Sequence, residues 1–209
     1  MAKLEGLYAI TPDWGDTARL IVVTEAILRG GCRIIQYRNK TATSSRRDEQ
    51  AGALRDLTRR FGVWLIVNDD LDLALAIDAD GAHLGSEDGD LAAARGRLGP
   101  GRILGASCYQ SLDTAGLAVL AGADYLAFGS FFASSTKPQA GRVEAALIGA
   151  AKQAWTLPVC AIGGITPENA GAPIAAGTDL LAASGAVYNS SDPERASRAF
   201  SQLFESRRP

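Results

Sequence analysis

The chain has 209 residues, 47% of them hydrophobic, and carries a net charge of -2 at neutral pH. This length suits one domain, so we expect residues 1–209 to form a single domain. The weak charge gives no basic field, which argues against nucleic acid as the main ligand. The sequence has three scattered cysteines without a CxxC pair, no signal-peptide core and no run of 18 apolar residues. These features predict a cytoplasmic protein that does not enter a membrane.

Strand-like apolar runs alternate with helical patterns along the whole chain. The predicted strands are residues 6–10, 33–38, 64–67, 81–84, 102–107, 124–128, 158–162 and 178–183. The predicted helices are residues 17–28, 43–61, 71–77, 91–98, 112–121, 143–155, 167–176 and 192–205, with Ser44 and Ser45 as candidate caps and Pro167 at a helix start. Eight strand-helix units without a linker predict an α/β fold, a single (β/α)₈ TIM barrel rather than an open doubly wound sheet.

A short helix-to-strand joint recurs in the sequence. Ala-Gly-Ala-Asp at residues 121–124 is echoed at residues 176–179 and, more loosely, at residues 78–81. In a (β/α)₈ barrel such joints lie on the face that stabilises the fold, whereas the chemistry lies where strands end. The residues that follow each strand are therefore the candidates for a site.

Acidic residues follow two successive strands. Asn68, Asp69 and Asp70 come after residues 64–67, and Asp88 lies in the acidic loop after residues 81–84. A helix between two strands makes them parallel, so both acidic ends meet at one edge of the sheet. Oxygen ligands suit Mg²⁺, which takes one or two carboxylates together with substrate phosphates. The alternative is that these acids are solvated loop residues.

Groups suited to phosphate follow other strands. Alternation sends Gln36, Arg38 and Lys40 to one side, as in a diphosphate clamp, although a solvated loop remains an alternative. The loop at residues 132–138 adds hydroxyls and a lysine, namely Ser134, Thr136 and Lys137. Paired small residues end the last two strands, at Gly163-Gly164 and Ser184-Gly185, where this fold usually binds phosphate.

Two further polar residues lie at or inside predicted strands. Ser107 ends a strand and has two interpretations, a hydrogen bond to a heterocycle or a structural role. His83, the only histidine, lies within a strand, which favours an interior or supporting residue over a catalyst. No Ser-His-Asp or Cys-His arrangement is indicated.

These motifs together resemble one enzyme family. QYRNK at residues 36–40, VNDD at 67–70, HLGSED at 83–88, SSTK at 134–137 and AIGGI at 161–165 are similar, in order and spacing, to the thiamine-phosphate synthase family. The resemblance runs from residue 7 to about residue 204. It implies a Mg²⁺-dependent transferase that joins 4-amino-2-methyl-5-hydroxymethylpyrimidine diphosphate to thiazole phosphate, giving thiamine phosphate and diphosphate.

The resemblance also implies roles for individual residues. Those implied to hold the pyrimidine diphosphate are Gln36, Arg38, Lys40, Asn68, Ser107 and Lys137, of which Arg38, Lys40, Ser107 and Lys137 are the catalytic set. Those implied to bind Mg²⁺ are Asp69 and Asp88. Those implied to hold the thiazole phosphate are Ser134, Thr136, Gly164, Ser184 and Gly185, although the family's serine is displaced at Ser184-Gly185.

Two alternatives remain beside the synthase. The first is a thiazole tautomerase-like branch, which shares the fold but lacks the full metal and pyrimidine motifs. This chain keeps Asp69, Asp88 and the whole Gln-x-Arg-x-Lys pattern. It also has Cys108 rather than histidine after Ser107. A non-catalytic sensor of phosphorylated ligands is the other, because fold alone does not establish activity. The expected partners are the small-molecule substrates.

Overall fold

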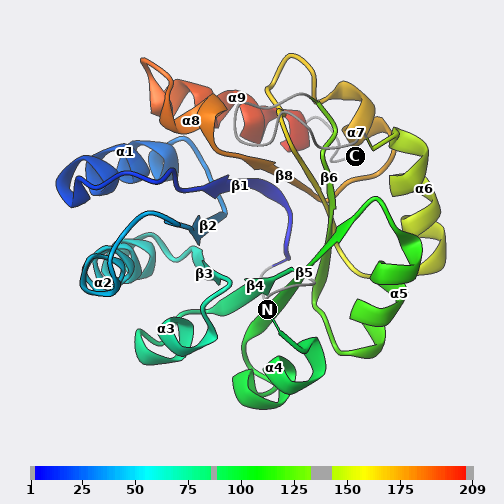
Figure 1. The fold of residues 1–209 in the computed structure, drawn as a ribbon. Helices are drawn as coiled ribbons and strands as arrows, with labels where there is room; N and C mark the ends of the chain where they lie inside the picture. The colour runs from blue at the N-terminus through cyan, green and yellow to red at the C-terminus, as the bar shows by residue number, and fades with distance from the viewer. Residues whose placement is uncertain (1–2, 86–88, 133–142, 206–209) are drawn as a thin grey trace.

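The structure is a computed structural model that describes residues 3–85, 89–132 and 143–205. In these residues eight parallel strands close into a barrel in sequence order, with β8 paired to β1. Figure 1 shows the strands at the centre and the helices around them. The predicted (β/α)₈ barrel is confirmed. None of the helices in the described ranges is long and apolar enough to span a bilayer.

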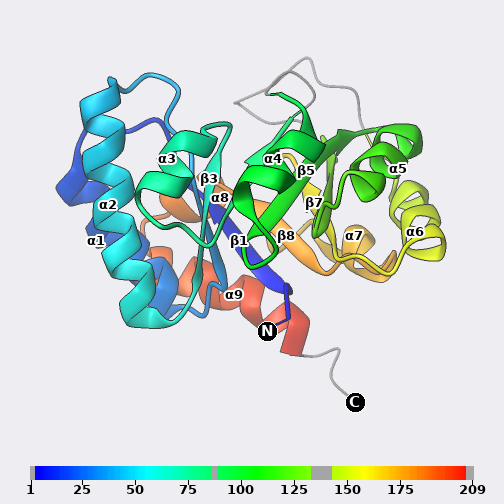
Figure 2. The ribbon, with the colours of Figure 1, turned by 90° about the horizontal axis from the view of Figure 1, so that it is seen from below.

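Strands and helices alternate, with one extra short helix near the end. The strands are β1 (Gly6–Ile10), β2 (Ile34–Tyr37), β3 (Trp64–Asn68), β4 (Gly81–Leu84), β5 (Ile103–Tyr109), β6 (Tyr125–Gly129), β7 (Val159–Ile162) and β8 (Leu180–Ala183). The helices are α1 (Thr17–Arg29), α2 (Ser44–Phe61), α3 (Leu71–Ala76), α4 (Leu91–Leu98), α5 (Leu112–Leu120), α6 (Ala145–Ala154), α7 (Gly171–Ala175), α8 (Gly185–Tyr188) and α9 (Pro193–Glu205). The last helix, α9, packs beside α1 and β1 (Figure 2).

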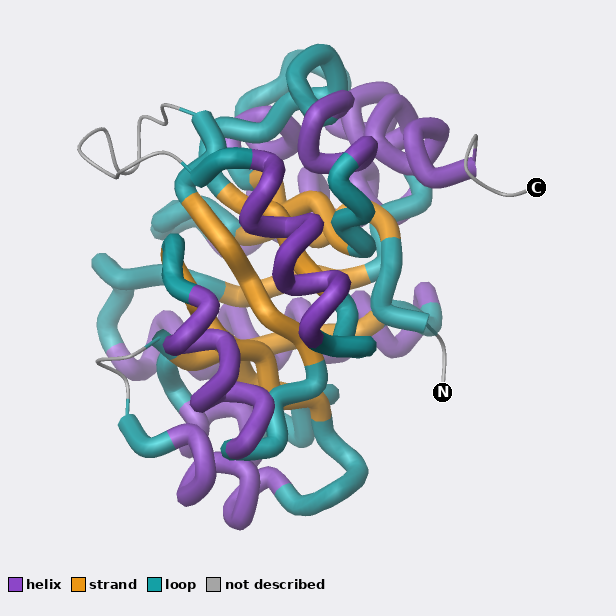
Figure 3. Tube along the Cα trace, turned by 90° about the vertical axis from the view of Figure 1, so that its right-hand side faces the viewer, coloured by secondary structure: helices purple, strands orange, loops and turns teal. Residues whose placement is uncertain are grey.

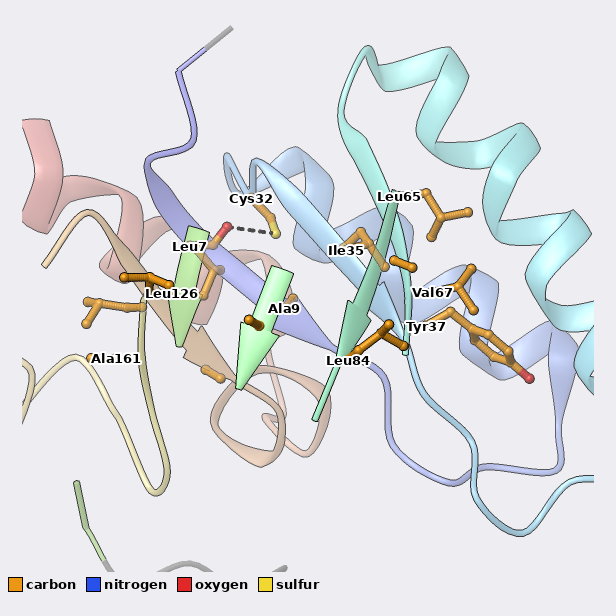
Figure 4. Close-up of a cluster of buried hydrophobic side chains, with 14 of the residues drawn as sticks. Leu7, Ala9, Cys32, Ile35, Tyr37, Leu65, Val67, Leu84, Leu126 and Ala161 are labelled. Atoms are coloured by element: carbon orange, nitrogen blue, oxygen red, sulfur yellow. Dashed lines mark hydrogen bonds between the residues drawn. The ribbon is translucent and has the colours of Figure 1, made fainter. Parts of the chain in front are cut away.

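Each strand contributes to two cores because successive side chains point to opposite faces. Tyr8 and Ile10 of β1 belong to the cluster inside the barrel, whereas Leu7 and Ala9 belong to the cluster between strands and helices. Figure 3 shows the helices as an outer layer around the strands, and Figure 4 shows part of the outer core. Most strand residues are buried on both faces of the sheet, although Tyr109 at the end of β5 is exposed. This burial explains the nearly continuous apolar runs in the sequence.

Three of the differences from the sequence prediction concern helices and their ends. Thr43, not Ser44 or Ser45, caps α2, because its Oγ1 accepts a hydrogen bond from Arg46 N. Helix α7 begins at Gly171 rather than Pro167, since Asn169 Oδ1 accepts from Thr166 N and closes a separate turn there. Helix α8 was not predicted, because one turn of helix is too short to show a 3.6-residue period.

The three cysteines are free and buried. Burial raises the pKa of the Cys32 and Cys108 thiols to about 12 and also raises the pKa of Cys160. The Cys32 Sγ–H donates a hydrogen bond to the Leu7 carbonyl oxygen at 3.4 Å (Figure 4). All three thiols are therefore protonated at neutral pH and act as packing residues.

The recurrent joint in the sequence has one structure in three places. In each place, an aspartate lies just before an even-numbered strand. Its carboxylate accepts a hydrogen bond from a backbone N–H of the preceding strand. The same carboxylate pairs with a basic side chain of an even-numbered helix. The three sets are Asp80 with Leu65 and Arg55, Asp124 with Leu104 and Arg95, and Asp179 with Val159 and Lys152. These contacts join neighbouring strands at their amino ends, as expected for the stabilising face.

We expect Asp80→Ala to lower the free energy of unfolding by about 2 to 3 kcal/mol, because it removes a charge-assisted bond to Leu65 N and leaves Arg55 without its closest partner. The side chains of Asp80 and Arg55 are only 17% and 11% exposed, so solvent replaces the pair poorly. Urea unfolding measures the change. Asp72→Ala is the control, since Asp72 is 85% exposed and should change stability by less than about 0.5 kcal/mol. Equal stability of the two variants would show that the joint is unimportant.

Candidate functional site

A cavity of about 580 Å³ lies at the carboxyl ends of β2, β3 and β4. This is the face at which (β/α)₈ barrels carry their chemistry. Its polar lining includes Arg38, Asn39, Lys40, Arg47, Asn68, Asp69, Asp70, Asp72, Asp90 and Arg97. The structure therefore brings the basic end of β2 and the acidic end of β3 into one cavity.

The loop after β2 is held in place by the end of β1. Thr11 Oγ1 accepts from Arg38 N and donates to Arg38 O, both at 2.8 Å. Asp13 Oδ1 accepts from Arg38 Nη1 at 3.2 Å and from Lys40 N at 2.8 Å. The Arg38 side chain is thereby fixed and only 21% exposed. Thr11 and Asp13 were not predicted as site residues, and their only signal is that β1, like β2, ends in polar residues.

Gln36 lies deeper than the sequence pattern suggested. It is 4% exposed, and its Nε2 donates to the Tyr8 hydroxyl at 2.7 Å inside the barrel. It is not among the described residues that line the cavity, whereas Arg38 and Lys40 are. Within the Gln-x-Arg-x-Lys motif, Gln36 therefore lies inside the barrel, whereas Arg38 and Lys40 lie at the rim.

Asp69 and Asp70 have different roles although they are adjacent. Asp69 adopts a left-handed backbone with φ of 62°, its N–H donates to His83 O at 2.9 Å, and its Oδ2 lies 3.2 Å from Lys40 Nζ. Asp70 Oδ1 caps α3 by accepting from Leu73 N at 2.9 Å. Aspartate tolerates this backbone better than most residues, but at a cost of about 1 kcal/mol, and such strain is typical of functional sites. In the cavity, Asp69 therefore pairs with Lys40, whereas Asp70 caps a helix.

The ligand atoms that line the cavity suit a hard cation. Asn68 and Asp69 supply oxygen atoms, and neither cysteine nor histidine is among the described residues that line the cavity. Within residues 3–85, 89–132 and 143–205 no three His, Cys, Asp or Glu side chains are grouped so that they could enclose a metal. Mg²⁺ needs no such enclosure when phosphates complete its coordination. The second carboxylate of the sequence prediction, Asp88, lies outside the described residues.

Ser107 and His83 meet inside the barrel. His83 is 7% exposed, and its Nε2 lies 2.9 Å from Ser107 Oγ while its Nδ1 lies 2.8 Å from the Tyr125 hydroxyl. The histidine is therefore a hydrogen-bonded interior residue, as predicted. Ser107 is half-buried, and the prediction that it ends a strand was wrong, because β5 continues two residues further to Tyr109. The imidazole of His83 supports its hydroxyl.

The ends of β7 and β8 lie side by side, because these strands pair. Gly163 and Gly164 have φ of 105° and 61°, and a Cβ on Gly163 would lie 2.0 Å from Ser130 Oγ, so only glycine fits there. Ser184 precedes α8, and its side chain makes no capping hydrogen bond. Gly164, Ser184 and Gly185 are thus near one another at the rim. Ser134 and Thr136, which are expected beside them, lie outside the described residues, as does Lys137, which is expected at the pyrimidine diphosphate.

Comparison with known proteins gives a consistent result. The family model described as thiamine monophosphate synthase matches residues 7–187. A thiamine-phosphate synthase from Methylobacillus flagellatus is 54% identical, covering 98% of this chain and 97% of the relative, and one from Thiobacillus denitrificans is 51% identical, covering 95% and 94%. A solved thiamine phosphate pyrophosphorylase from Pyrococcus furiosus is 34% identical with a TM-score of 0.86, covering 97% of this chain and 96% of the other. The chain therefore belongs to the thiamine monophosphate synthase family.

Proposed function

We propose that residues 1–209 act as one catalytic unit, a thiamine-phosphate synthase. It joins 4-amino-2-methyl-5-hydroxymethylpyrimidine diphosphate to thiazole phosphate and releases diphosphate. The observation that carries the proposal is one cavity in which Arg38 and Lys40 lie with Asp69. Relatives above 50% identity that bear this name support the same reaction.

The pyrimidine diphosphate has a charged diphosphate and a neutral ring, and different residues suit each part. Arg38 and Lys40, with Lys137, would hold the diphosphate, while Gln36, Asn68 and Ser107 would hold the ring. Asp13 and Thr11 fix Arg38 before the ligand arrives. The Arg38 side chain therefore loses less conformational entropy when the ligand binds. A guanidinium suits two phosphate oxygens at once, and the lysine adds a compact charge.

Asp69 and Asp88 would hold Mg²⁺ beside these cations. When bound, Mg²⁺ would offset the negative charge of the diphosphate as it departs. Lys40 lies within reach of the same oxygens, because its Nζ already lies 3.2 Å from Asp69 Oδ2. The thiazole phosphate would lie across the rim, held by Ser134, Thr136, Gly164, Ser184 and Gly185.

The order of bond events follows from these groups. Among the described residues we identify no free general base in the cavity, whereas Arg38 and Lys40 are placed to stabilise a leaving anion. The bond from the pyrimidine methylene carbon to oxygen breaks first, and its electron pair leaves with diphosphate. The aminopyrimidine ring delocalises the resulting cation. The thiazole nitrogen then forms the new C–N bond with its lone pair and needs no deprotonation.

The direct test of the function mixes the purified protein with both substrates and Mg²⁺ and separates the products by chromatography. We expect equal amounts of thiamine phosphate and diphosphate, and no thiamine phosphate when either substrate is left out. A protein that binds thiazole phosphate but never forms thiamine phosphate would instead match the tautomerase-like or sensor alternatives.

Removing the carboxylate of Asp69 should abolish most activity. Asp69→Asn is the suitable variant because asparagine also tolerates the left-handed backbone of this residue. We expect a loss of roughly 100-fold in kcat/KM at limiting Mg²⁺, with an unchanged unfolding transition, and a similar loss for Asp88→Asn. Asp72→Asn removes the same charge from the same cavity and should have little effect. Full activity of Asp69→Asn at limiting Mg²⁺ would exclude its role as a metal ligand.

A side chain at Gly164 should weaken thiazole phosphate selectively, since it blocks approach to the backbone. We expect Gly164→Val to raise the KM for thiazole phosphate roughly tenfold, about 1.4 kcal/mol, with a smaller change for the pyrimidine diphosphate. Gly62→Val is a matched control, because Gly62 has a similar φ of 64° but ends α2 at the other end of the barrel. A change confined to the pyrimidine diphosphate would place the thiazole phosphate elsewhere.

The dissociative order of events predicts a large electronic effect. An electron-withdrawing group in place of the methyl on the pyrimidine ring destabilises the cation, so single-turnover chemistry should slow by orders of magnitude, at about 1.4 kcal/mol per factor of ten. Binding of the analogue is measured separately as the control. A bound analogue that reacts at the normal rate, with chemistry limiting, would indicate displacement driven by the nucleophile.

A further inference from the structure

Five side chains form a continuous chain of hydrogen bonds through the inside of the barrel. They come from five strands and connect two residues assigned above to the pyrimidine. In order, the contacts are Gln36 Nε2 to Tyr8 OH at 2.7 Å, Tyr8 OH to Tyr125 OH at 2.7 Å, Tyr125 OH to His83 Nδ1 at 2.8 Å, and His83 Nε2 to Ser107 Oγ at 2.9 Å. We call this set the inner hydrogen-bond chain.

Packing fixes the rings of the inner hydrogen-bond chain. Tyr8 and Tyr125 are 1% and 0% exposed, with ring centroids 5.8 Å apart in an edge-to-face arrangement. His83 stacks on Tyr125 with centroids 5.6 Å apart and planes at 22°. Gly105 makes room for this arrangement, because a Cβ there would lie 2.1 Å from Tyr125 Cζ. The rings therefore have little freedom to exchange partners.

The donors and acceptors permit one direction along this chain. The amide nitrogen of Gln36 can only donate, so the Tyr8 oxygen accepts there. In the described part of the protein the Tyr8 hydroxyl has one other hydrogen-bond partner, Tyr125, and its proton goes there because a buried, unpaired O–H is costly. Tyr125 then donates to His83 Nδ1, and the ring proton of His83 stays on Nε2, facing Ser107.

Burial raises the pKa of Tyr8 and of Tyr125, so both phenols keep their protons throughout the physiological pH range. We propose that the inner hydrogen-bond chain fixes His83 as the Nε2–H tautomer and thereby makes the Ser107 hydroxyl a hydrogen-bond donor toward the ligand. Tyr8, Tyr125 and His83 are positioning residues in this scheme, because they act through Ser107.

The consequence is a preference among pyrimidines, and this part rests on the proposed function. A 4-aminopyrimidine offers ring nitrogens that accept the Ser107 proton. The 4-oxo counterpart carries a proton on the ring nitrogen beside its carbonyl, so a Ser107 O–H directed at that nitrogen meets a donor instead of an acceptor. A site built to hydrogen-bond one pattern rejects the other strongly. Discrimination against the oxo ring is therefore set by residues that do not contact the ligand.

The tautomer can be measured without any substrate. His83 is the only histidine in the chain, so protein labelled with ¹⁵N-histidine gives the signals of one imidazole. Two-bond ¹H–¹⁵N correlation spectra at neutral pH should show Nε2 protonated and Nδ1 unprotonated. Protonation of Nδ1, alone or together with Nε2, would overturn the proposal whatever the enzyme's reaction.

The ligand preference is tested with Tyr125→Phe. Without the Tyr125 proton, His83 is free to adopt the Nδ1–H form and accept from Ser107, whose oxygen can then accept from the oxo ring. Calorimetry compares the Kd of the amino and oxo pyrimidine diphosphates, and we expect their ratio to fall about tenfold or more. Tyr188→Phe is the matched control. It removes another buried hydroxyl, which is hydrogen-bonded to Thr24 and does not belong to the inner hydrogen-bond chain.

The two parts of the test separate two kinds of failure. An unchanged Kd ratio in Tyr125→Phe, or an equal change in Tyr188→Phe, would contradict the role of the inner hydrogen-bond chain in selectivity. If neither pyrimidine diphosphate binds the wild-type protein, the proposed function fails, and the spectrum of His83 still decides the tautomer. If Tyr125→Phe does not fold, competition between the two pyrimidines on the wild-type protein must still favour the amino form by at least about tenfold.

Discussion

Closure of eight parallel strands is the constraint on which the rest of this structure depends. Because every neighbouring pair of strands is parallel and β8 closes onto β1, all eight strands end on the same rim. Residues far apart in the sequence, such as Asp13, Lys40 and Asp69, can then meet although no loop between them is long. The opposite rim is free to carry stabilising contacts, of which the three aspartate joints are the clearest.

The polar groups are sorted by depth. Ions lie at the rim, where water still reaches Lys40 and Asp69 and the cost of holding a charge is low. The interior holds neutral groups, and the phenols, amide and imidazole of the inner hydrogen-bond chain satisfy one another there. A diphosphate therefore meets charge at the rim, while a neutral ring meets fixed donors and acceptors below it. This division matches the two halves of the proposed substrate.

Much of this could be predicted from the sequence, because strand and helix periods are local. The barrel, the strand ends and the candidates Arg38, Lys40 and Asp69 follow from such patterns. Contacts across the barrel do not: Tyr8 and Tyr125 are 117 residues apart, and both read as ordinary apolar strand residues. The depth of Gln36 and the support of Arg38 by Asp13 depend on strand register, which no single segment encodes. The early start predicted for α7 was wrong for a related reason, since the side chain of Asn169 closes a turn there.

We infer that the cavity at the ends of β2 and β3 holds the diphosphate. A crystal structure of the protein with Mg²⁺ and diphosphate would test it most directly. We expect diphosphate between Arg38 and Lys40, with the metal ion on Asp69. Diphosphate bound only at the opposite end of the barrel, in the cavity of about 410 Å³ that Gly31 and Arg33 help to line, would contradict it.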